Sequence, residues 1–176
     1  MHHAAKELLS EGDYAFETLT IPVVAARADV HPTTVYRRWR TIPELLADVA
    51  TSSFSGEVVV PDTGSLPSDL ERWVDDIMTD LQDPDVQALI RAAVGAGPEA
   101  GSACITDRRA QLAAMLERER SRGGATPDLE QAADLLLGPL YYRAIFTGRP
   151  VETGCESMLV ALLLSLPPQR AGRVLG

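Results

Sequence analysis

The stretch TIPVVAARADVHPTTVYRRWRTIPELL, residues 20–46, decides the fold. Apolar residues recur in its first part at the spacing of one helix face, namely Ile21, Val24, Ala25 and Ala28. The pattern then breaks, and Pro32 follows at a place where the first residue of a helix needs no N–H. Thr41 and Glu44 have the spacing of a capping box, which predicts a third helix from about Ile42. The stretch therefore predicts two short helices joined by a tight turn, followed by the start of a third.

The second of these helices is predicted to have one buried face and one polar, cationic face. At about 100° per residue, Val35 and Trp39 share the buried face. The opposite face and its flanks carry Thr33, Thr34, Tyr36, Arg37 and Arg40. A helix with such a face fits the major groove of DNA, where arginine bonds a guanine edge or a phosphate and threonine contacts a thymine methyl or a phosphate oxygen. The sequence thus predicts a DNA-recognition helix.

This stretch resembles the DNA-binding segment of the TetR family of transcriptional regulators. The residues on which the resemblance rests are Thr20-Ile21, Ala25-Ala26, Ala28, Val30, Thr34-Val35-Tyr36, Trp39, Thr41 and Leu45. Asp29 stands where the family usually has a glycine, His31 where it has a capping serine, and Ile42 where it has a phosphate-contacting lysine. Aspartate tolerates a left-handed backbone, so we expect the turn to form. Loss of the lysine is expected to weaken DNA affinity and to flatten its salt dependence.

The polar face and the resemblance together give a predicted set of DNA-binding residues: Thr20, His31, Thr33, Thr34, Tyr36, Arg37, Arg38, Arg40 and Thr41. The net charge of the chain is −9, of which residues 1–50 account for −2. Three of the five cations in that range lie between Arg37 and Arg40. We therefore expect a local positive patch on an acidic protein, with weak binding to random DNA.

The whole chain is predicted to be all-α, because 45% of its residues are apolar and only 5% are aromatic. Residues 1–50 are the predicted DNA-binding domain, with a first helix at 2–11 and with Tyr14 and Phe16 in the core. A stretch punctuated by Pro and Gly, residues 55–67, marks the boundary to a helical domain at 51–176 and is expected to be extended at 58–60.

Further helices are predicted at about 68–81, 84–97, 99–122, 128–148 and 152–165. A capping box at Ser68 and Glu71 is expected to start the first of them. The alternating charges of residues 108–122 are typical of a solvated face. Gly138-Pro139 predicts a kink inside the next helix, because proline removes a backbone bond and clashes with the preceding turn.

The last two helices are predicted to form a homodimer interface. Both are apolar on more than one side, so each needs a second partner, and the same pair from another subunit would complete a four-helix bundle. Residues 61–66 and 134–143 also resemble one TetR subgroup, and in the family these last helices pair two subunits. The resemblance further implies a small-molecule site in this domain. The residues predicted to bind a largely apolar ligand are Trp73, Ile77, Met78, Met115, Tyr141 and Phe146, for each of which ordinary core packing is an equal alternative.

The expected function is therefore that of a TetR-like repressor that binds a palindromic operator as a homodimer and is released by its ligand. The alternative is a helical sensor or interaction dimer that has lost tight DNA binding, as the residue at Ile42 and the acidic balance suggest. An enzyme is not expected, because no nucleophile with a base, no catalytic carboxylate pair and no metal-spaced histidine cluster stands out. Neither a cofactor nor a metal site is expected, and Cys104 and Cys155 are interpreted as small helical residues. A cytoplasmic protein is expected, because the sequence contains no signal peptide, transmembrane run or lipidation motif.

Overall fold

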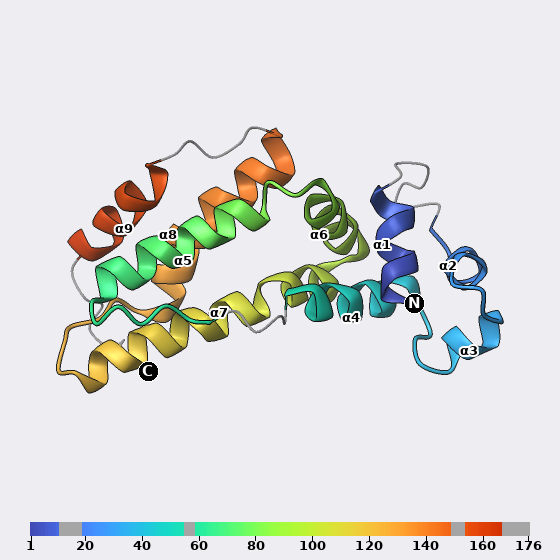
Figure 1. The fold of residues 1–176 in the computed structure, drawn as a ribbon, viewed down its shortest axis with the longest axis horizontal. Coiled ribbons are helices and arrows are strands. Elements are labelled where there is room, and N and C mark those ends of the chain that lie inside the picture. Colours follow the sequence, from blue (N-terminus) through green and yellow to red (C-terminus); the bar gives the residue numbers. More distant parts are fainter. Residues whose placement is uncertain (11–18, 55–58, 149–153, 167–176) are drawn as a thin grey trace, which may run out of the picture. The chain divides into compact units, whose positions relative to one another are not determined.

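The computed structural model describes residues 1–10, 19–54, 59–148 and 154–166 (Figure 1). Within these ranges every regular element is a helix, as the sequence predicts. The chain divides into two compact units. Unit 1 comprises residues 1–58 and 82–107, and unit 2 comprises residues 59–81 and 108–176. No helix in the described part of the chain is both long and apolar enough to cross a membrane.

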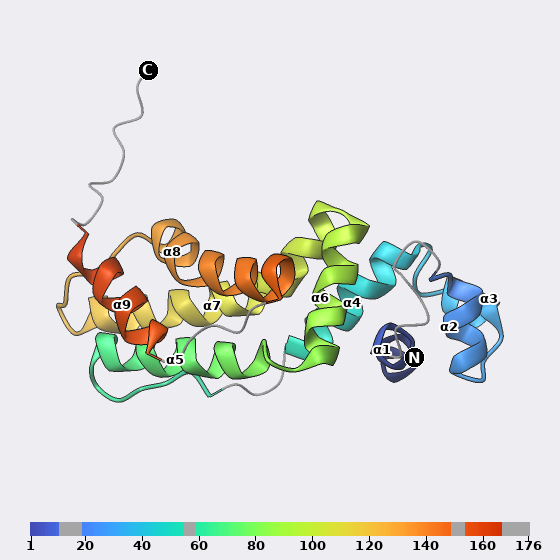
Figure 2. The same cartoon turned by 90° about the horizontal axis from the view of Figure 1, so that it is seen from above.

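Unit 1 consists of four N-terminal helices and one helix from later in the chain. The helices are α1 (His2–Ser10), α2 (Ile21–Arg27), α3 (Pro32–Tyr36), α4 (Ile42–Phe54) and α6 (Pro84–Ala96), followed by the first part of α7 (Pro98–Ser121). α1 packs against α2, α4 and α6, while α2 and α3 lie together (Figure 2). α4 also packs on α6. The core of unit 1 therefore includes α6, which lies beyond the domain boundary predicted near residue 50. The division into a DNA-binding domain and a ligand-binding domain at that boundary stays a prediction.

The apolar side chains of α6 bury themselves in this core. Leu89, Ile90 and Ala93 are at most 1% exposed. The helix starts as the sequence predicts, because the Asp83 carboxylate accepts a hydrogen bond from the backbone N–H of Asp85 at 2.8 Å. It ends at Gly97, whose φ of 120° is open to glycine but strained for other residues.

Unit 2 is built from α5 (Leu66–Asp80), the second part of α7, α8 (Leu129–Tyr142), η2 (Arg143–Thr147) and α9 (Cys155–Ser165). α5, α7 and α8 run alongside one another in both views, and α9 packs on α5 and α8 (Figures 1 and 2). The predicted apolar stripe of α5 is buried at Leu70, Trp73, Val74, Ile77, Met78 and Leu81. This stripe forms the centre of the core of unit 2.

The start of α5 differs from the sequence prediction. The helix begins at Leu66 with Ser65 at the N-cap position, ahead of the capping box expected at Ser68. Proline at position 67 is compatible with this start, because the first turn of a helix has no bond for its missing N–H to make. Asp69 is only 2% exposed and accepts hydrogen bonds from the N–H and the hydroxyl of Thr63, at 2.6 and 2.7 Å. Asp69 thus ties the entering chain to the first turn.

The irregular part of the α8 region lies one turn later than predicted. The chain stays α-helical through Gly138 and Pro139 to Tyr142, and then forms a π-helical turn, η2. A π turn bonds residues five apart and is one way in which a helix absorbs a local irregularity. Gly148 ends it with a φ of 61°. The structure thus adds a π turn after Gly138-Pro139 that the sequence did not predict, and a kink at Gly138-Pro139 itself stays a prediction.

Other sequence predictions fall partly outside the described residues. Val59 is 84% exposed, and residues 59 and 60 have no regular structure, in agreement with the predicted extended connection. Val58, Tyr14 and Phe16 lie outside the described ranges.

Candidate nucleic-acid interface and ligand site

The turn between α2 and α3 forms without a glycine. Asp29 has a φ of 52°, in the left-handed region that aspartate tolerates better than most residues. The backbone N–H of Ala28 bonds to the carbonyl of Val24, and that of Val30 bonds to the carbonyl of Ala25, each at 3.0 Å. These bonds close the end of α2, so the expectation that Asp29 supports the turn is confirmed.

His31 takes the capping position at the start of α3. Its backbone is extended, and its Nδ1 accepts a hydrogen bond from the Thr33 N–H at 3.3 Å. The same nitrogen lies 2.8 Å from the Thr33 hydroxyl. An imidazole nitrogen therefore accepts the capping hydrogen bond that a serine oxygen accepts in the usual family pattern. Pro32 follows as the first helical residue, as predicted. A contact of His31 with DNA stays a prediction.

The two faces of α3 are arranged as the sequence predicts. Val35 is 0% exposed and Trp39 is 7% exposed, so both belong to the scaffold. The regular helix ends at Tyr36, but the N–H of Trp39 still bonds to the carbonyl of Val35 at 2.9 Å. The exposed residues of this segment are Thr33, Thr34, Tyr36, Arg37, Arg38 and Arg40.

The predicted set also includes one threonine at the start of each flanking helix. Thr20 occupies the N-cap position of α2 and is exposed, but its side chain makes no capping hydrogen bond. Thr41 does cap α4, because its hydroxyl accepts from the N–H of Glu44 at 3.3 Å. The Glu44 carboxylate reaches back to the N–H of Arg40 at 2.8 Å, one residue earlier than in a standard capping box. These two hydrogen bonds link the first turn of α4 to Arg40 and Thr41, the residues that precede it.

Asp48 of α4 joins three elements of unit 1. Its Oδ2 lies 3.0 Å from His2 Nε2 and accepts hydrogen bonds from Arg38 NH2 and Trp39 Nε1, each at 3.1 Å. The Arg38 guanidinium also lies over the Trp39 ring, 4.6 Å from its centroid. Sequence reasoning missed Asp48. The available signal was Trp39, because a buried indole N–H usually has an acceptor and an acid on the following helix is a natural source.

The residues predicted to bind a ligand do not all lie together. Trp73, Ile77, Met78 and Met115 are buried in the core of unit 2. Tyr141 is half-buried. Phe146 lies at the surface of unit 2, where it is 70% exposed and its ring stacks on that of Tyr142 with centroids 6.0 Å apart. The core members of the predicted set therefore come from α5 and α7.

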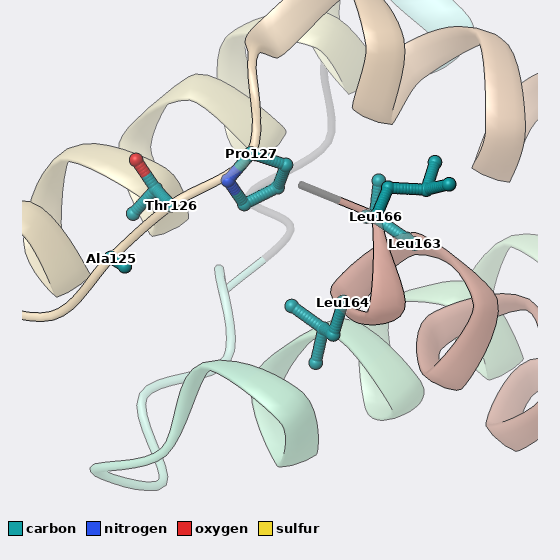
Figure 3. A pocket seen from close by; sticks show the side chains of 6 residues that line it. All are labelled: Ala125, Thr126, Pro127, Leu163, Leu164 and Leu166. Carbon is teal, nitrogen blue, oxygen red and sulfur yellow. The ribbon is translucent and has the colours of Figure 1, made fainter. Parts of the chain in front are cut away.

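Two pockets of unit 2 lie away from these residues. One has a volume of about 80 Å³, with Pro127 on one side and leucines from the end of α9 on the other (Figure 3). Its lining residues are Ala125, Thr126, Pro127, Leu163, Leu164 and Leu166. This volume is well below the roughly 300 Å³ at which ligand pockets usually begin. The other has a volume of about 420 Å³ and is lined by Asp128, Glu130, Gln131, Asp134, Leu135 and Leu166, so it includes none of the residues predicted to bind a ligand.

A buried polar network lies beside Trp73. Arg108 is 2% exposed, forms an ion pair with Asp80, and donates to Gln111 Oε1 at 3.3 Å. The same Gln111 oxygen accepts from Trp73 Nε1 at 2.8 Å. Within the described residues, Arg108 Nε has no hydrogen-bond partner. The prediction that residues 108–122 form a solvated face is therefore wrong at Arg108, because the end of α5 supplies an anion that lets the guanidinium be buried.

Arg118, in the last turn of α7, and Arg122, just after this helix, hold the chain that leads into α5. Arg118 donates to the carbonyl of Pro61 at 2.7 Å and lies 3.2 Å from the Asp62 carboxylate. Arg122 donates to the same carboxylate at 2.6 Å. The hydrogen bond and charge of Arg118, together with Arg122, lower the pKa of Asp62. These cations are thus engaged in ion pairs across unit 2.

Replacing Asp80 by asparagine is expected to lower the free energy of unfolding by about 2–3 kcal/mol. Removal of one partner of a fully buried ion pair costs about 3–5 kcal/mol, and half of the Asp80 side chain is exposed, which reduces that cost. The measurement is urea unfolding followed by tryptophan fluorescence. The matched control is Asp76→Asn, an exposed acid on the same helix, for which a change within about 0.5 kcal/mol is expected. Equal effects of the two substitutions would show that Arg108 does not depend on Asp80.

Cys104 is expected to resist a thiol-reactive disulfide reagent in the folded protein. Its side chain is 1% exposed, and burial raises the pKa of its thiol to about 11. Only the thiolate attacks such reagents, so Cys155, which is partly exposed, should react first. Labelling before and after denaturation, read by mass spectrometry, checks this order.

The same pKa shift predicts how stability changes with pH. The folded state favours the protonated thiol, so this stabilisation is fully present below pH 9 and is lost as the pH rises towards 11. Cys104→Ala should lack that part of the alkaline loss, and an unchanged alkaline profile in the variant would contradict the assignment.

The turn, the capped α3 and its exposed polar face define a helix-turn-helix DNA-binding protein. A model of the tetracyclin repressor-like C-terminal domain matches residues 60–163. The HTH-type transcriptional regulator AqdR of Rhodococcus erythropolis is 32% identical over 149 residues, which cover 81% of this chain and 72% of that protein. YdeS, an uncharacterized HTH-type transcriptional regulator of Bacillus subtilis (strain 168), is 29% identical over 158 residues, which cover 85% of this chain and 78% of YdeS.

A solved structure gives the same result for the fold. The TetR family transcription regulator SCO0332 matches with a TM-score of 0.71 and 26% identity, covering 95% of this chain and 96% of that one. The chain belongs to the TetR family of transcriptional regulators. The relatives are regulators and not enzymes.

Proposed function

We propose that this protein is a repressor that binds a near-palindromic operator as a homodimer and is released by a small molecule. The observation on which the proposal rests is the exposed polar face of α3 on a buried scaffold. Arg37 and Arg40 are exposed and form no ion pair with any other residue that the structure describes, so their donors are available to DNA. Thr33, Thr34 and Tyr36 flank them. This set suits contacts with base edges and phosphates in a major groove.

An exposed apolar surface on unit 2 supports the homodimer. Large apolar side chains of η2, α9 and the end of α8 are 37–70% exposed in a single chain, namely Tyr142, Phe146, Met158, Leu162 and Leu164. An apolar surface of this kind usually marks an interaction site, and a second copy offers the same surface for a symmetric contact. In such a dimer the recognition helices would meet major grooves about 34–36 Å apart, or a multiple of that distance apart.

The proposed ligand site is the core of unit 2, to which Trp73, Ile77, Met78 and Met115 contribute buried side chains and Tyr141 a half-buried one. The lining is largely apolar, which favours a largely apolar ligand. Phe146 is assigned to the dimer surface because of its exposure. Release of DNA requires that the ligand bind the DNA-incompetent state more tightly than the competent one.

Operator selection from random DNA tests the proposal. A pseudo-palindromic consensus is expected, and a gel shift should follow with matching intergenic DNA beside the gene. A dimer that gives no sequence-specific shift at low salt would instead be a sensor or interaction protein that has lost DNA binding. Screening of apolar compounds by thermal shift tests the ligand part, because a ligand that binds only the folded state raises the melting temperature.

A further inference from the structure

The three arginines in and just after α3, Arg37, Arg38 and Arg40, differ in whether a carboxylate pairs with them. Arg37 and Arg40 form no ion pair within the described residues, whereas Arg38 bonds to Asp48 at 3.1 Å and lies over the Trp39 ring. The Arg38 side chain is nevertheless 65% exposed. A cation in this position would be available to a phosphate if nothing held it. Its carboxylate partner therefore affects how this segment meets DNA.

The position of the Asp48 carboxylate is fixed by more than its partner arginine. Trp39 Nε1 donates to the same oxygen at 3.1 Å, and the Trp39 side chain is buried. Asp48 itself lies on α4, whose first turn is capped by Thr41. An anchored acid holds an arginine with less entropic cost than a mobile surface acid, because only one long side chain must be ordered.

Binding of arbitrary DNA depends mainly on contacts between cations and phosphates. Each contact releases counterions and adds about 0.9 to the slope of log affinity against log salt concentration. An arginine that must leave a carboxylate and an indole ring to reach a phosphate contributes less than a free one. Arg37 forms no ion pair among the described residues, so a contact of Arg37 with a base edge would not involve this exchange.

We propose that Asp48 is a specificity-determining residue that restrains Arg38 and so suppresses charge-driven binding to arbitrary DNA. The proposal rests on the DNA-binding role of α3 and goes beyond the identity of the operator or the ligand. Asp48 acts through Arg38, so it is a positioning residue and does not itself bind DNA. Arg37 and Arg40, which form no ion pair within the part of the chain that the structure describes, remain for the operator.

The test substitution is Asp48→Asn. The asparagine oxygen can still accept from Trp39 Nε1, while the charge that holds Arg38 is lost. Affinity for a short labelled duplex of arbitrary sequence is measured by fluorescence anisotropy over a series of salt concentrations. The slope of log affinity against log salt is expected to steepen by about 1 for each subunit that contacts the duplex, as for one added phosphate contact per subunit. Because the duplex is arbitrary, the measurement does not depend on the operator or on ligand release.

Two further variants separate restraint from net charge. In an Arg38→Ala background, Asp48→Asn should leave the slope unchanged, and Arg38→Ala alone should flatten the slope by much less than 1. Asp29→Asn removes one acid of the same unit that has no arginine partner among the described residues, and asparagine tolerates its left-handed backbone. This control should not steepen the slope.

Three results would overturn the proposal. The first is a change of slope for Asp48→Asn that is equally large in the Arg38→Ala background, or a change of the same size for Asp29→Asn. Either outcome would show that the slope responds only to net charge. The second is an unchanged slope for Asp48→Asn at an unchanged melting temperature. The third is a loss of about 1 in slope per contacting subunit for Arg38→Ala alone, which would show that Arg38 is already an ordinary phosphate contact. The third result remains decisive even if Asp48→Asn does not fold.

Discussion

Arg37→Ala is expected to weaken binding to the selected operator by about 1–3 kcal/mol for each half-site, with the dimer intact. The Arg37 side chain is exposed on the polar face of α3, and no described residue pairs with it. Its five donors are thus available for a guanine edge or a phosphate. Both subunits of a dimer carry the change, so the loss applies twice. Fluorescence anisotropy at one fixed salt concentration measures it, because affinities at different salt concentrations are not comparable.

Arg72→Ala is the matched control for this loss. Arg72 is an exposed arginine of α5, and its removal takes the same charge from the other unit. Operator binding should be nearly unchanged in this variant. Tyr36→Ala, which truncates the exposed tyrosine beside Arg37, should weaken operator binding in the same direction. If either α3 variant dissociated the dimer, as seen by size-exclusion chromatography with light scattering, α3 would be part of the subunit interface and the proposed division of roles would fail.

Leu162→Asp is expected to convert the dimer into monomers and to abolish useful operator affinity. Leu162 of α9 is 49% exposed in a single chain, so the substitution costs the protomer little. In the proposed interface the new carboxylate would be desolvated without a partner, which costs several kcal/mol. A penalty of about 3 kcal/mol already raises the Kd of the dimer by more than 100-fold. Sedimentation over a range of protein concentrations gives the oligomeric state.

The control for this change is Val59→Asp. Val59 is 84% exposed and precedes α5 in the chain, outside η2 and α9. The control should stay dimeric and keep its operator affinity. A Leu162→Asp protein that remains dimeric would place the subunit interface elsewhere, and a monomer that keeps full operator affinity would show that the two half-sites do not need to be linked.

Local sequence patterns predicted those features that depend on neighbours in the chain. The spacing of Val35 and Trp39 gave the inner face of α3 because helical periodicity is set by backbone geometry. Asp83-Pro84 predicted the start of α6 because the capping residue and the first turn are contiguous in sequence. The left-handed Asp29 was predictable from the conformations that aspartate tolerates.

The features that were not predicted depend on distant partners. Arg108 is buried because Asp80, on another helix, neutralises it, and a run of alternating charges cannot show which member will find such a partner. Several acids lie in residues 1–50, and the sequence does not show that Asp48 is the one that bonds to Trp39 and Arg38. Each of these depends on tertiary contacts rather than on propensity.

The position of α6 in unit 1 has a consequence for how the parts of this protein can be separated. The chain leaves unit 1 after residue 58, returns at 82 and leaves again after 107. A cut after α4 would strip Leu89, Ile90 and Ala93 from the apolar faces of α1 and α4 and leave those faces open to water. We therefore expect the segment that is proposed to bind DNA to need α6 for its stability. A chimera that exchanges specificity with a relative would have to graft the exposed face of α3 onto this scaffold, rather than join one protein's first helices to another's remainder.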